Sequence, residues 1–78
     1  MFTQNEQILD WLRQGRSITP LEAMQNFQCF RLAARISELR ERGKAEGFRI
    51  LTFHDEDAEG KRKPYARYVL MEKGEDNG

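Results

Sequence analysis

Two arginines on one expected helix, Arg31 and Arg35, are the residues whose type and spacing point most directly to chemistry. Side chains four residues apart share a face of an α-helix, so both guanidinium groups are expected on one outward surface. Guanidinium groups bind phosphate oxygens and the edge of guanine in the major groove of DNA. The pair therefore predicts a DNA-contacting surface, to which we add Gln28 and Arg42. The alternative is a solvated face on which Glu38 pairs with Arg35 or Arg42.

A second basic cluster, Lys61, Arg62 and Lys63, follows an acidic run within residues 55–59. Basic side chains gain affinity for DNA by displacing counterions from its phosphates. We therefore expect these three side chains to contact the DNA backbone, with Gly60 separating them from the acidic run. The acidic residues must then point away, because within a Debye length of roughly 8–10 Å they would cancel the attraction. The alternative is a charged turn that keeps the protein soluble and protects a strand edge.

Zero net charge is the main objection to DNA binding, since 13 Lys and Arg stand against 13 Asp and Glu. The charges are unevenly distributed, however. From Arg31 to Arg49 there are six basic and three acidic residues, which gives this segment a net charge of +3. We therefore expect binding that is weak and sensitive to salt.

The segment that carries the arginine pair has the pattern of two helices joined by a tight turn. Thr19 is a predicted N-cap, Pro20 suits the first helical position, and Glu22 completes a capping box. We expect this helix to end near Asn26, because asparagine tolerates the left-handed conformation that ends helices. The turn is then expected over residues 26–28.

The second of these helices is expected to begin at Cys29 and to end at Gly43. Its buried face is predicted from apolar residues at helical spacing, which are Leu32, Ile36 and Leu39. Residues 44–47 are then expected to link this helix to the next element. The predicted motif is a helix-turn-helix.

Sequence patterns on either side of this motif predict a further helix and two strands. Thr3 and Glu6 have capping-box spacing, which predicts a helix over residues 4–14. After residue 44 the apolar residues follow a period of about two, which predicts strands over residues 48–53 and 65–70. Between these strands lies a polar loop.

The predicted fold class is α+β: a winged helix-turn-helix, in which three helices are followed by a β-hairpin wing. A chain of 78 residues forms one domain with a small core. We expect this domain over residues 1–71 and a flexible C-terminal tail over residues 72–78.

The chain resembles small winged helix-turn-helix domains of phage and prophage proteins. The resemblance covers roughly residues 5–71 and is carried by residues 19–23, 31–36, 39–40 and 68–70 and by Gly60. In such domains the third helix enters the major groove and the hairpin contacts the flanking backbone. The resemblance implies the first role for Arg31 and Arg35 and the second for residues 61–63. Gln28 is a departure, because related sequences often have glycine at this turn.

The remaining residues give little support for other functions. One cysteine cannot form an internal disulfide, and Cys29 is expected to be a small buried residue. His54 has no second histidine or paired cysteine near it, so we expect no metal, no cofactor and no enzymatic activity. No segment approaches the roughly 18–20 apolar residues of a membrane span, and no secretory signal is seen, so we expect a soluble cytoplasmic protein.

Two classes of function remain. The first is a DNA-binding protein, either a small transcriptional regulator or a recombination accessory factor, with double-stranded DNA as its partner. Such a protein is expected to form a homodimer, because one small domain contacts few base pairs. The second is a protein-interaction module of the same fold that binds or inhibits a larger host or phage protein. Zero net charge, the acidic run and aromatic residues at the surface favour the second class, and an exposed Phe30 would do so in particular.

Overall fold

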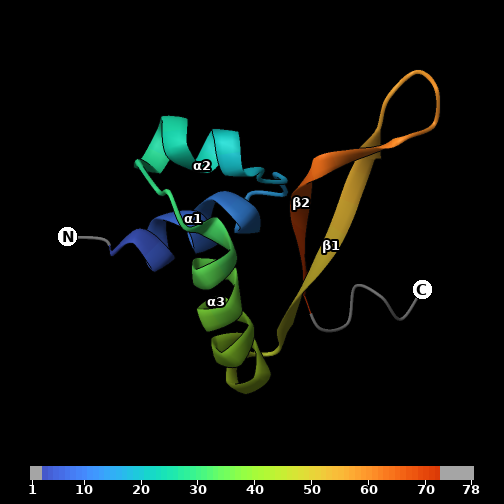
Figure 1. Ribbon diagram of the computed structural model, residues 1–78. Coiled ribbons are helices and arrows are strands. Elements are labelled where there is room, and N and C mark those ends of the chain that lie inside the picture. The colour runs from blue at the N-terminus through green and yellow to red at the C-terminus, as the bar shows by residue number, and fades with distance from the viewer. Residues whose placement is uncertain (1–2, 73–78) are drawn as a thin grey trace.

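The computed structural model describes residues 3–72, which form three helices and a β-hairpin (Figure 1). The helices are α1 (Gln4–Arg13), α2 (Pro20–Phe27) and α3 (Leu32–Glu46), and the strands are β1 (Phe48–Glu56) and β2 (Arg62–Glu72). The predicted winged helix-turn-helix fold is therefore confirmed. Within the predicted tail over residues 72–78, Glu72 is the last residue of β2, and residues 73–78 lie outside the described part of the chain.

Capping boxes begin α1 and α2, as their sequences predict. In α2, the Glu22 amide donates to Thr19 Oγ1 at 3.3 Å, and the Thr19 amide donates back to Glu22 Oε1 at 3.0 Å. Thr3 and Glu6 form the same reciprocal pair at the start of α1, with both bonds at 3.2 Å. These bonds satisfy amides that have no partner inside a helix, so both helix starts are determined locally.

The turn between α2 and α3 lies later in the chain than predicted. Helix α2 continues through Asn26 and ends at Gln28, whose φ of 53° is left-handed. The amides of Gln28 and Cys29 donate to carbonyls in the last turn of α2, at 2.9 and 3.1 Å. Because this closure uses residues 28 and 29, α3 begins at Leu32 and not at Cys29. Gln28 thus adopts the conformation that glycine favours.

Gly43 does not end α3, contrary to the prediction. It is a buried residue within the helix, which ends at Gly47 with a φ of +87°. The predicted link over residues 44–47 is therefore mostly helical. A Cβ atom on Gly43 would lie 2.5 Å from the carbonyl oxygen of Phe48 and 3.0 Å from its ring. Glycine is required here because the first residue of β1 crosses α3 at this point.

The hairpin strands are longer than predicted, and only residues 57–61 form the loop. Arg62 and Lys63, predicted as loop residues, lie in β2, and Asp55 lies in β1. The loop closes tightly because the Asp57 amide donates to the carbonyl of Lys61 at 2.8 Å. The pairing is regular up to His54↔Ala66 and then shifts before Glu56↔Arg62.

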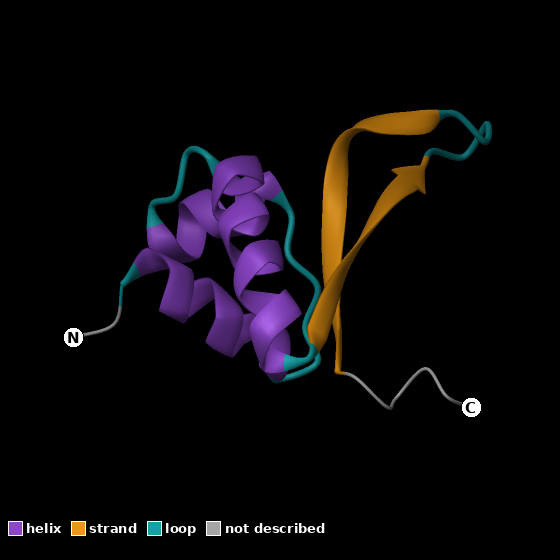
Figure 2. Ribbon diagram, turned by 90° about the horizontal axis from the view of Figure 1, so that it is seen from below, coloured by secondary structure: helices purple, strands orange, loops and turns teal. Residues whose placement is uncertain are grey.

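The base of the hairpin packs against the helices, and its loop projects away from them (Figure 2). Ile18, which precedes α2, forms a β-bridge with Tyr68, with N–H···O distances of 3.0 and 2.9 Å. The buried apolar residues come from all five elements and the connections between them: Ile8, Leu9, Leu12, Ile18, Ala23, Cys29, Leu32, Ile36, Leu39, Phe48, Ile50, Tyr68 and Leu70. The core therefore holds α3 and the base of the hairpin in one fixed arrangement.

Candidate nucleic-acid interface

Arg31 presents an unpaired guanidinium at the start of α3. It is the exposed N-cap residue of the helix, and its side chain forms no hydrogen bond or ion pair with any residue between 3 and 72. Gln28 and Phe30 beside it are also exposed, and 80% of Phe30 is accessible to solvent. The turn before α3 thus combines a cation, an amide and an aromatic ring on one protruding segment.

The sequence spacing predicted that Arg31 and Arg35 share one outward face. In the structure they do not. The side chain of Arg35 is half-buried, and its Nη2 lies 3.2 Å from Glu38 Oε2. The same carboxylate accepts a hydrogen bond from Asn5 of α1 at 2.9 Å. The reason is that Arg31 precedes α3, so the helical four-residue spacing does not apply to the pair. Arg35 lies on the flank of α3 that faces α1.

Arg42 also points toward α1. It forms an ion pair with Glu46, and Glu46 accepts a further hydrogen bond from Arg13 at 3.3 Å. The bond from Arg42 lowers the pKa of Glu46, which stays ionised at neutral pH. Arg42 is therefore paired with an acid on its own helix, although its side chain remains exposed.

Arg40 has a structural role that the charge count did not distinguish from its neighbours. Its guanidinium donates to the carbonyl oxygen of Ile50 from Nε and Nη2, at 3.1 and 2.9 Å, and from Nη2 to Thr52 Oγ1 at 2.7 Å. It also lies 5.9 Å from the ring centre of Tyr68. Arg40 thus joins α3 to β1. Sequence periodicity carries no signal for a side chain that bonds to a distant backbone carbonyl.

The wing, which consists of β1, β2 and the loop at residues 57–61, carries its basic groups near the loop. Lys61 and Arg62 are exposed and Lys63 is half-buried. The nearest acid to Lys61 is Glu59, at 4.0 Å, where both side chains are more than three-quarters exposed. Such an exposed contact is worth little, so these cations remain available to a ligand.

Part of the acidic run has a structural role. Asp57 Oδ1 accepts hydrogen bonds from the backbone amides of Glu59 and Lys61, both at 2.9 Å. Asp55 is bound by Arg67, and these hydrogen bonds, together with one from Tyr65, hold the pKa of Asp55 below its usual value. Two of the four acidic groups in this run therefore point at partners inside the protein.

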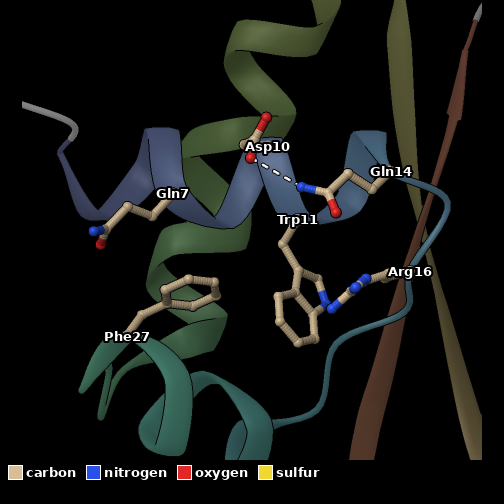
Figure 3. A pocket seen from close by; sticks show the side chains of 6 residues that line it. All are labelled: Gln7, Asp10, Trp11, Gln14, Arg16 and Phe27. Carbon is tan, nitrogen blue, oxygen red and sulfur yellow. Dashed lines mark hydrogen bonds between the residues drawn. The ribbon is translucent and has the colours of Figure 1, made fainter.

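A surface pocket of about 240 Å³ lies between α1 and α2 (Figure 3). Trp11 and Phe27 meet edge to face in it, with ring centres 5.6 Å apart. The guanidinium of Arg16 lies 4.7 Å from the indole centre, and Trp11 Nε1 donates to the carbonyl of Ser17 at 2.8 Å. These contacts close the junction of the helices, so the pocket is explained by packing.

Other kinds of site find no support in the part of the chain that the structure describes. Residues 3–72 contain no group of three His, Cys, Asp or Glu side chains that could hold a metal. In the same range, no helix has the length and apolar character needed to cross a membrane.

Three helices followed by a β-hairpin define a protein of the winged helix-turn-helix class. Comparison with known families agrees: a family model described as a winged helix-turn-helix domain matches residues 3–73. The chain belongs to this family. No curated protein and no solved structure matches it.

Proposed function

We propose that this protein binds double-stranded DNA, with the start of α3 in the major groove and the wing on the flanking backbone. The observation that carries the proposal is the exposed guanidinium of Arg31 at the N-terminal end of α3, which is unpaired within residues 3–72. In helix-turn-helix proteins, the N-terminal residues of this helix contact base edges. Exposed Lys61 and Arg62 supply cations for phosphates.

The biological role that fits best is a small phage-type or prophage-type transcriptional regulator, or a recombination accessory factor, acting in the cytoplasm without catalysis. One domain of this size contacts few base pairs, so useful specificity requires two half-sites. We therefore propose that the protein acts as a homodimer on DNA.

The experiment that tests DNA binding is fluorescence anisotropy with a labelled random duplex at roughly 50 and 200 mM salt. Three exposed cations are removed in the variant Arg31→Ala/Lys61→Ala/Arg62→Ala. The matched control, Arg35→Ala/Arg42→Ala/Lys44→Ala, removes three cations of α3 that are paired with acids. We expect affinity that falls steeply with salt, a strong loss in the triple variant and a small loss in the control. Absence of binding by the wild type at the lower salt concentration would refute the proposal.

A second candidate function, docking onto a larger protein, is favoured by one specific observation. Phe30 is 80% exposed and Leu21 is 58% exposed, and the two lie on the helix-turn-helix segment. Exposed apolar side chains of this size often mark protein contacts when they are contiguous. If Phe30→Ser abolishes recovery of a partner protein in a pull-down, and the wild type fails to bind duplex DNA, this second function replaces the first.

A further inference from the structure

Arg67 in β2 contacts three separate segments of the chain. Its Nε and Nη2 donate to the carboxylate of Asp55 in β1, with the shortest distance, 2.8 Å, from Nη2 to Oδ2. Its Nη1 donates to Ser17 Oγ at 2.8 Å and lies 4.0 Å from Glu22 Oε1 at the start of α2. One side chain therefore links both strands of the wing to the segment that enters α2.

The position of this cluster within the wing is informative. Asp55 lies where the regular pairing breaks, between His54 and Glu56. Tyr65 donates to Asp55 Oδ2 at 3.1 Å from the opposite strand. Figure 1 shows that β2 bends sharply where its colour changes from orange to red, between its outer and inner halves. The cluster thus lies at the register shift, where the outer wing joins the regularly paired part of the hairpin.

The chemistry of the cluster suits arginine. A planar guanidinium can donate two parallel hydrogen bonds to a carboxylate and still direct a third donor elsewhere. Lysine carries the same charge but has no such fork. The carboxylate of Asp55 is about one-third exposed, as is Arg67, so the pair is accessible to water and its effect is mainly on geometry.

We propose that Arg67 is a positioning residue for DNA binding: it holds the outer wing at the angle that brings Lys61 and Arg62 to the same duplex as Arg31. This inference rests on the proposed function. Its physical basis is that, within residues 3–72, no hydrogen bond or ion pair joins the side chain of Lys61 or Arg62 to a helix, so their orientation depends on the rigidity of the hairpin at the Arg67 cluster.

The experiment is a double-mutant cycle in the full chain, with Arg67→Lys and Lys61→Ala/Arg62→Ala as its two changes. Duplex binding is measured by anisotropy over a series of salt concentrations. In the wild type, removing both loop cations should lower the slope of log affinity against log salt by roughly 1.8 and weaken binding about tenfold near 100 mM salt. In the Arg67→Lys background, the same removal should weaken binding by less than about threefold, because the wing no longer reaches the phosphates.

The matched control is Arg35→Lys, which also exchanges a forked cation for a lysine in an ion pair but lies on α3, away from the wing. The effect of removing Lys61 and Arg62 should be as large in this background as in the wild type. Ser17→Ala removes only the third hydrogen bond of Arg67 and should give a smaller change in the same direction. If Arg67→Lys fails to fold, Ser17→Ala takes its place in the cycle.

Residual dipolar couplings of the amides in residues 57–61 give a readout that does not depend on DNA. In the free wild type they should fit the same orientation as the helices, and in Arg67→Lys they should not. Couplings that are unchanged, or an equal effect of removing Lys61 and Arg62 in both backgrounds, would overturn the role of Arg67 while leaving DNA binding intact. A wild type that binds no duplex would overturn both proposals.

Discussion

The basic residues of α3 and those of the wing differ in how the fold uses them. On α3, Arg35 pairs with Glu38, Arg42 pairs with Glu46, and Lys44 lies 2.8 Å from Glu41. Near the loop of the wing, Arg62 has no such partner within residues 3–72, and Lys61 has only a distant one. The number of cations in a segment therefore does not tell how many of them are available to bind a ligand.

This comparison suggests a division of roles between the two regions. Helix α3 contributes shape and, at its start, the one guanidinium of Arg31 that is unpaired within the described residues. The wing contributes the exposed cations Lys61 and Arg62 near its loop. Specificity for a base sequence should therefore depend on Arg31, and sensitivity to salt should depend mainly on the wing.

The largest expected effect comes from Gly43, where α3 contacts the first residue of β1. Gly43→Ala forces a Cβ atom against the carbonyl of Phe48, which should lower the free energy of unfolding by about 3 kcal/mol. Urea denaturation measures the change, and Ser37→Ala at an exposed position of α3 is the control. Helix propensity alone predicts the opposite sign, a gain of about 1 kcal/mol, so a stabilised variant would disprove the close approach.

The next largest effect is a difference in DNA affinity between loss of the unpaired Arg31 and loss of the paired Arg42. Arg31→Ala should weaken binding to a selected target sequence by about 2 kcal/mol and reduce discrimination between sequences. Arg42→Ala, which removes a paired cation, should cost less than about 0.5 kcal/mol. Anisotropy with the selected duplex and a scrambled duplex measures both. Equal losses in the two variants would remove the distinction between free and paired arginines.

A smaller effect is expected at each cation of the wing. Arg62→Ala should lower the salt slope by about 1 and weaken binding to all sequences alike, because a phosphate contact carries no sequence information. The same two duplexes, measured over a series of salt concentrations, test this. A loss confined to the selected duplex would assign base recognition to the wing and reverse the proposed division.

The smallest effect concerns pH. Arg67 lowers the pKa of Asp55 in the folded protein from its ordinary value of 3.8. The ionised carboxylate of Asp55 therefore stabilises the fold at every pH above that ordinary value. This stabilisation is lost as the pH falls through the lowered pKa. Asp55→Asn should therefore melt at a lower temperature than the wild type near neutral pH, and the difference should shrink below about pH 4. Circular dichroism follows both melting curves, and a difference that is constant with pH would contradict the linkage.

The order of the elements and the starts of two helices could be predicted because the interactions that determine them are local. Thr19 and Glu22 cap α2 through residues three apart, and the apolar spacing of α3 defines its buried face without reference to any other element. The same local reasoning failed at Gly43. Glycine ends many helices, but here it is required by the approach of Phe48, which no local pattern reveals.

For the candidate interface, sequence determined the types of residue and tertiary structure decided their availability. Local spacing identified Arg31, Arg35 and the basic cluster of the hairpin as candidates. Arg35 pairs with Glu38, three residues further along the same helix, which is the alternative that local spacing allowed. The packing of the hairpin, in contrast, directs Arg40 to the carbonyl of Ile50, a contact between two different elements. A side chain's partners in such contacts are set by how whole elements pack, and its own sequence neighbourhood does not encode them.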